Sequence, residues 1–417
     1  MFVVSAADVL ISYFANVFHV SIFQRPWVAL LLLLLLGIAF DLKTFSRLFG
    51  LYTACFFGLV FCLGFGAATV PHPGTAVSTQ LDAMQMKDLV TVSTAYLIGA
   101  MCALKLRDDG HLLSGTFLAL TAVHAIVCII ALSSIAPDLF PVLDKPYYND
   151  GRLVSRPEIT TDQTRQVFYL FGCLFTIFTS KSLLRLLISV GICIAIAFIV
   201  AKVQSRWGAL TFALFAAFAY FLGLFYGVQR RVSVLGVIAV GAITITWFHA
   251  AITAFLGDLL WRFAQVDLNL GGRAPSILYL FEKLADPSYW LPKGYGEFYA
   301  IYGAAPHSFP TMIYLYGGII GLMLYGILLV GPLWQLGKLV FSRRADSIQR
   351  IAFFSSSFAF ALLMTQPVIS HEIFWLFTGF SVGVICRTSY QRTPVRGVAV
   401  SPAKSVQQTR IPQNIMM

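Results

Sequence analysis

Charged residues are scarce in this 417-residue chain. Asp, Glu, Lys and Arg together make up 11% of it, against 58% hydrophobic and 15% aromatic residues, whereas a soluble domain contains about 25% charged residues. Water therefore cannot be the solvent for most of the folded surface. Because apolar runs repeat along almost the whole length, we expect one membrane domain rather than two or three soluble ones.

Cysteines are missing from the polar stretches. All seven lie inside apolar runs, and none has the spacing of metal ligands. We therefore expect neither a disulfide framework nor a metal site, and interpret these residues as small hydrophobes. The first apolar stretch also lacks a basic segment before it, so no cleavable signal peptide is expected.

Nucleotide and cofactor motifs are missing as well. The chain has no phosphate-binding loop, no dinucleotide-type glycine fingerprint after a strand, and no paired aspartates of the kind that hold a metal on a diphosphate. We therefore expect no cofactor and no metal, and we assign the net charge of +11 to membrane topology rather than to nucleic-acid binding.

Most of the sequence consists of hydrophobic runs that are long enough to span a membrane. A membrane-spanning helix needs about 20 mostly apolar residues. This requirement predicts an all-α, polytopic transmembrane helical bundle of about 12 spans. The expected spans are 5–23, 27–40, 48–70, 88–105, 112–136, 166–180, 184–203, 207–227, 232–256, 308–334, 350–369 and 372–387.

The distribution of lysine and arginine predicts the orientation. Short cytoplasmic loops are enriched in these residues, and more than half of the 29 lie on one side if both termini are cytoplasmic. The predicted organisation is spans 1 to 9 in 1–256, an extracytoplasmic catalytic loop in 257–307, spans 10 to 12 in 308–390, and a basic cytoplasmic tail in 391–417. The outward loop 137–165 is Pro-rich and is expected to be irregular.

The long loop before span 10 has its own pattern. A helix is expected from Pro275 to Leu284, because proline is tolerated in a first helical turn and Asp286-Pro287 would end the helix. The loop also carries aromatic residues that suit a membrane interface. These are Trp261, Tyr279, Tyr289, Trp290, Tyr295, Phe298 and Tyr299.

Three outward residues could carry chemistry. Arg206 lies in a very short turn between two uncharged spans, Arg273 follows a glycine pair that allows close approach, and His307 stands at the entry to span 10. Each also has a structural interpretation: an interfacial arginine, a loop arginine paired with Glu282 or Asp286, and a satisfied interfacial histidine. Together they offer two fixed guanidinium forks for phosphate oxygens and a neutral base, which is typical of a diphosphate site.

A family resemblance rests on motifs between about residues 202 and 324. The motifs are Ser205-Arg206, Gly272-Arg273, Gly294-Tyr295-Gly296, His307, and the run from Tyr316 to Leu322 with Gly317, Gly318 and Gly321. In these motifs the chain resembles the O-antigen ligase and O-antigen (exopolysaccharide) polymerase family, with Ser308 where the family histidine is often followed by Asn.

The resemblance implies an inverting, metal-independent glycosyltransferase of the bacterial inner membrane, with its active site facing the periplasm. Its donor would be a glycan linked to undecaprenyl diphosphate, and its acceptor a lipid A core or another lipid-linked repeat unit. His307 would be the general base, Arg206 and Arg273 would stabilise the leaving diphosphate, and the substrate would lie against neighbouring positions. These are Ser205, Gly272, Gly294 and Gly296.

Other interpretations stay open. The motifs do not separate a ligase from a polymerase, and they do not say whether a chain-length regulator binds. A polytopic transporter or lipid-linked glycan flippase fits the number of spans, with His124 and His249 as mid-span ionisable residues. Paired broken helices or an internal repeat would favour that alternative, and a structural scaffold is a third reading.

Overall fold

The structure is a computed structural model, and the residues that it describes are almost all helical. These are residues 42–48, 50–69, 86–105, 118–119, 122, 126, 147–149, 152–154, 183–203, 273–302, 306, 308–362 and 372–392. The expected spans at 5–23, 27–40, 166–180, 207–227 and 232–256, and almost all of 112–136, lie outside them.

The expected spans that fall on the described residues are helices. Among the described helices, α4 and α15 are long and apolar enough to cross a membrane, whereas α5 and α17 contain shorter apolar stretches. The bounds are α3 Leu42–Ser46, α4 Leu51–Thr69, α5 Met86–Lys105, α9 Leu183–Val203, α15 Phe309–Phe341, α16 Ser347–Leu362 and α17 Glu372–Arg392.

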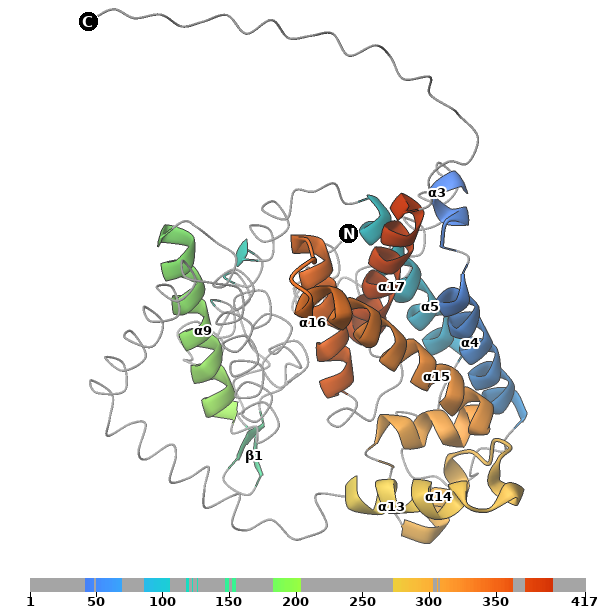
Figure 1. The fold of residues 1–417 in the computed structure, drawn as a ribbon. Coiled ribbons are helices and arrows are strands. Elements are labelled where there is room, and N and C mark those ends of the chain that lie inside the picture. The colour runs from blue at the N-terminus through green and yellow to red at the C-terminus, as the bar shows by residue number, and fades with distance from the viewer. Residues whose placement is uncertain are drawn as a thin grey trace, which may run out of the picture.

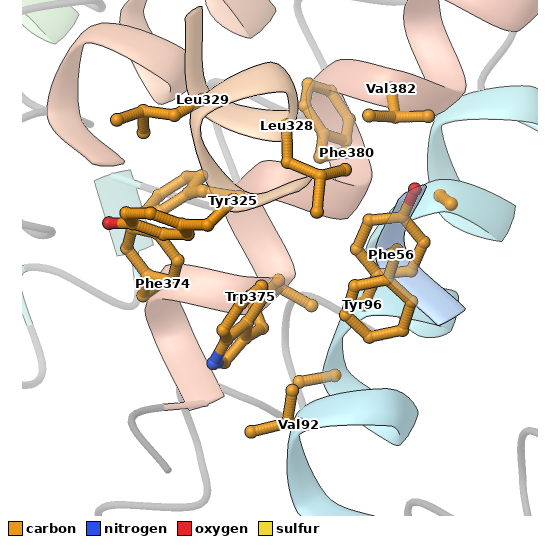
Figure 2. Packing of buried hydrophobic residues seen from close by; sticks show 14 of the residues in the cluster. Phe56, Val92, Tyr96, Tyr325, Leu328, Leu329, Phe374, Trp375, Phe380 and Val382 are labelled. Carbon is orange, nitrogen blue, oxygen red and sulfur yellow. The ribbon is translucent and has the colours of Figure 1, made fainter. Parts of the chain in front are cut away.

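Aromatic side chains form the centre of the helix bundle. The rings of Phe56 on α4 and Tyr96 on α5 stack with centroids 3.7 Å apart, and Trp375 on α17 meets Phe56 edge-on at 5.6 Å. Figure 2 shows these rings between α4, α5 and α17, with Tyr325 of α15 beside Phe374. Buried aromatic side chains thus hold together elements from both ends of the chain.

Glycines bring α5 and α17 into close contact. A Cβ atom at Gly99 would overlap the carbonyl oxygen of Leu376, and one at Gly379 would overlap that of Tyr96. Gly383 lies one helical turn after Gly379 and similarly faces Ala100. This is the small-residue spacing that lets transmembrane helices pack backbone to backbone.

Helix α15 is broken at Gly318, which has φ 62° and ψ −163°. The first limb, Phe309 to Gly317, folds back along the second, because the rings of Phe309 and Tyr325 have centroids only 5.5 Å apart. A straight helix would separate these residues by about 24 Å. The helix expected over 308–334 is therefore present but is not straight, because its long limb begins only after Gly318 (Figure 1).

The second limb of α15 exposes a continuous apolar face. Its exposed large hydrophobic residues recur every three, four or seven positions, which places them on one side of the helix. They are Ile320, Met323, Ile327, Val330, Trp334 and Phe341. Phe57, Phe61 and Phe65 form a similar exposed row on α4. A core helix of a soluble protein would bury such a face, whereas lipid can cover it without cost.

The segment 137–165 contains a short hairpin that we did not expect. Strand β1, Tyr147–Asn149, pairs antiparallel with β2, Arg152–Val154, with Asn149 opposite Arg152. The connection is Asp150-Gly151, a dipeptide favoured in two-residue hairpin loops. The prediction of an irregular loop was wrong at these residues.

Candidate functional site

A cap of short helices precedes α15. It consists of α13 Arg273–Leu284, the 3-10 turn η6 Pro287–Tyr289, and α14 Tyr295–Tyr302. Figure 1 shows α13 and α14 together at one end of the bundle, beside the first limb of α15. The predicted helix from Pro275 to Leu284 is confirmed and begins two residues earlier, whereas α14 was not predicted.

The cap is joined to α15 through the break in that helix. The Ile319 amide, which would bond Leu315 in a continuous helix, instead donates to the carbonyl of Trp290 at 2.9 Å. The Leu315 carbonyl accepts from Lys293 and Gly294 at 3.1 and 2.9 Å. The backbone groups released by the break are therefore satisfied by the cap, as buried polar groups require.

Hydroxyl groups on the first limb of α15 hold α13 and η6. Thr311 donates to the carbonyl of Ser276 at 2.9 Å, and Tyr314 donates to the carbonyls of Tyr289 and Lys283 at 2.6 and 3.2 Å. Thr311 and Tyr314 are three positions apart, so both lie on one face of the limb. The sequence signal for this contact, which did not enter the prediction, is a pair of hydroxyl residues at helical spacing within an apolar run.

An aromatic cluster joins α13 to α14. Tyr279 and Phe298 are buried, with ring centroids 5.2 Å apart, and Tyr302 lies 4.7 Å from Phe298. The expected interfacial aromatic face is therefore partly wrong, because Tyr279 and Phe298 point into the cap. Trp290 is exposed, and its contact with a membrane interface stays a prediction. Trp261 and the side chain of Tyr295 lie outside the described residues.

The charged groups of the cap surround Tyr289. The ammonium of Lys283 lies 4.0 Å from the centre of its ring and that of Lys293 lies 5.3 Å away, distances at which the ring face attracts a cation. A hydrogen bond with Tyr289 raises the pKa of Lys283. Asp286 accepts the Ser288 amide at 2.9 Å, and this bond lowers the pKa of Asp286. Burial raises the pKa of Tyr279.

Most of the predicted catalytic residues cannot be compared directly with this geometry. Arg206, Ser205, Gly272 and His307 lie outside the described residues, and only the backbone of Arg273 is described. Arg273 is the first residue of α13. Pro306 and Ser308, the neighbours of His307 in sequence, are both buried.

The two remaining predicted residues have defined backbone positions. Gly294 is buried with φ 73°, a conformation that favours glycine, and its amide bonds Leu315. The structure thus gives Gly294 a role in docking the cap. Gly296 lies in the first turn of α14 and is partly exposed. Contact of either glycine with a substrate stays a prediction.

The described geometry brings the starts of α13 and α15 together. Ser276 lies in the first turn of α13 and Thr311 in the first turn of α15, and their hydrogen bond joins these turns. No family of known proteins, no individually curated protein and no solved structure shows a match to this chain.

Proposed function

We propose that this chain is a polytopic glycosyltransferase of the bacterial inner membrane, of the O-antigen ligase or polymerase type. It transfers a glycan from undecaprenyl diphosphate to an acceptor hydroxyl during assembly of a surface polysaccharide. The acceptor is a lipid A core in the ligase form and another lipid-linked repeat unit in the polymerase form. Both ends of the chain are cytoplasmic, and the cap faces the periplasm.

One contact supports this proposal most directly. The Thr311 to Ser276 hydrogen bond joins the first turns of α15 and α13. In sequence, His307 precedes the first of these helices closely and Arg273 begins the second. This contact between the two helix starts supports a site in which His307 as base and Arg273 as phosphate-binding fork act on the same substrate.

The proposed reaction needs two tasks from these residues. His307 accepts the proton of the acceptor hydroxyl. At the same time the hydroxyl oxygen forms a bond to the anomeric carbon of the donor, from the face opposite the diphosphate. The bond between that carbon and the diphosphate oxygen breaks, and undecaprenyl diphosphate leaves with its electron pair. Arg206 and Arg273 offset the growing negative charge, and oriented cations in a site with little water contribute several kcal/mol to such a step.

Reconstitution tests this proposal. Purified protein, a lipid-diphosphate glycan and an acceptor should give product in the presence of a chelator and without ATP, because the proposed site uses side-chain cations in place of a metal. Activity that disappears with chelator and returns with Mg²⁺ would contradict the proposed mechanism.

A transporter or lipid-linked glycan flippase is the second candidate, and the break in α15 specifically favours it. Discontinuous helices are common at the substrate sites of transporters, and Gly318 interrupts α15 in this way. Lipid vesicles that contain the purified protein and a labelled lipid-linked glycan distinguish the two. Movement of the labelled lipid-linked glycan across the bilayer without any glycosidic product would favour the transporter.

A further inference from the structure

The exposed end of the cap adjoins the lipid-facing side of α15. Trp290 and Leu291 are 47% and 72% exposed, and Ile320 at the start of the second limb is 60% exposed. The bond from Ile319 to Trp290 holds the two segments together, and a Cβ atom at Gly318 would lie 2.5 Å from the Trp290 carbonyl oxygen. The apolar patch of Trp290, Leu291 and Ile320 therefore continues the exposed apolar face of α15.

The C-terminal end of that face also carries residues that are typical of a membrane interface. Trp334 is 65% exposed, and the ammonium of Lys338 lies 4.6 Å from its ring centre. Exposed Arg343 and Arg344 follow the end of the helix. Tryptophan and lysine together are typical of the boundary between lipid tails and headgroups.

The distance along α15 between the level of Trp290 and that of Trp334 and Lys338 matches the thickness of a bilayer's hydrocarbon layer. From Ile319 to Lys338 an α-helix rises about 30 Å, which is the thickness of the hydrocarbon layer. Helix α4 packs along the part of α15 nearest the cap, because a Cβ atom at Gly331 would lie 2.5 Å from the Tyr52 ring and one at Gly66 would overlap the Tyr316 carbonyl. The end of α4 therefore lies level with the break in α15, whereas Tyr52 in its first turn reaches Gly331, seven residues before Lys338.

We propose that Trp290 and Leu291 insert into the lipid interface on the cap side of the membrane and set the height of the cap above it. The occupant of the patch is the boundary between headgroups and acyl chains of the bilayer that α15 crosses. Burying this patch in lipid removes apolar surface from water, while Lys293, exposed two residues later, reaches the headgroups. The inference rests on the proposed membrane location and not on glycosyl transfer.

Depth measurement on the full chain tests this proposal. A nitroxide is attached at Leu291→Cys, with the native cysteines replaced, in nanodiscs of phosphatidylethanolamine and phosphatidylglycerol that each hold one copy. The rate at which the nitroxide collides with oxygen, which is concentrated in lipid, is compared with the rate at which it collides with a water-soluble nickel chelate. Glu282→Cys, exposed on α13, is the aqueous control, and Met323→Cys on the second limb is the lipid control.

The expected result is that oxygen collisions dominate at 291, as they do at 323, whereas nickel collisions dominate at 282. Strong nickel access at 291 would overturn the proposal, and so would shielding from both reagents, which would mean that protein covers the patch. Trp290→Cys provides a second label if Leu291→Cys does not fold. Because the readout is depth, it is independent of whether the protein transfers glycans.

Discussion

At the scale of the residue, Gly318 combines a positive φ with the close approach of a neighbouring segment. Its φ of 62° and ψ of −163° lie in a region that is essentially restricted to glycine and costs other residues about 1–3 kcal/mol, and a Cβ atom would also press against Trp290 and Pro292 of the cap. The glycine therefore allows both the reversal of α15 and the attachment of the cap. Replacing it should disturb the helix and the cap together.

We predict that Gly318→Ala lowers the thermal unfolding midpoint of the detergent-solubilised protein. Gly326→Ala on the second limb is the matched control, because nothing lies within 4 Å of a Cβ atom there. Alanine stabilises a helix interior by about 1 kcal/mol over glycine, so the control should be neutral or more stable. Equal midpoints for the two variants would contradict the described break.

The hydroxyl of Tyr314 gives a second prediction. Tyr314→Phe removes the bonds to the carbonyls of Tyr289 and Lys283 and should destabilise the protein by about 1–3 kcal/mol, since acceptors lose their partner. The hydroxyl of Tyr325 is buried, and within the described residues it has no hydrogen-bond partner. Tyr325→Phe should therefore be nearly neutral. Chemical denaturation in mixed micelles compares the two, and a larger loss for Tyr325→Phe would contradict the assigned contacts.

At the scale of the element, the pairing of α5 with α17 depends on the absence of side chains. A Cβ atom at Gly379 would overlap the Tyr96 carbonyl, whereas at Gly191 on α9 nothing lies within 4 Å. Gly379→Ala should destabilise the bundle by about 1–3 kcal/mol through overpacking, and Gly191→Ala should not. The measurement is the fraction of folded monomer after heating, and an unaffected Gly379→Ala variant would contradict the close packing.

The helices and their ends were largely predictable from sequence. Hydrophobic length located α4, α5 and α17, and Pro275 with Asp286-Pro287 located α13, because these signals act locally. The reversal at Gly318 was not predictable, since the glycine run at 317, 318 and 321 also fits simple helix packing. It depends on cap residues about 25 positions earlier in the chain, whose backbone groups replace the hydrogen bonds of the helix at the break. Hydropathy carries no information about such long-range hydrogen bonds.

The candidate site was predicted less completely. The position of Arg273 at a helix start follows from local signals, but the contact between Thr311 and Ser276 joins segments whose pairing no local pattern encodes. Tyr279 was expected at the membrane interface and is buried in the cap. An aromatic residue suits a lipid boundary and a protein core equally, so only the tertiary fold decides between them.

At the scale of the whole molecule, the proposed orientation places the cap outside and the segment between α15 and α16 inside. A cysteine at Arg152, in the β-hairpin, should react with an impermeant thiol reagent added to intact cells, and a cysteine at Arg344 should react only after lysis. The basis is the excess of lysine and arginine on one side. Reaction at position 344 in intact cells would reverse the assigned topology.

The central claim is that His307, Arg273 and Arg206 form one glycosyl-transfer site at the cap. The measurement that tests it is glycan product per inserted protein, with donor binding recorded separately. His307→Ala should lower product by about 10²–10⁴-fold through loss of the base, and Arg273→Lys should also fail because an ammonium lacks the bidentate fork. Arg152→Lys, in the β-hairpin and outside the proposed site, is the control and should retain full activity. Full activity in His307→Ala would contradict the claim.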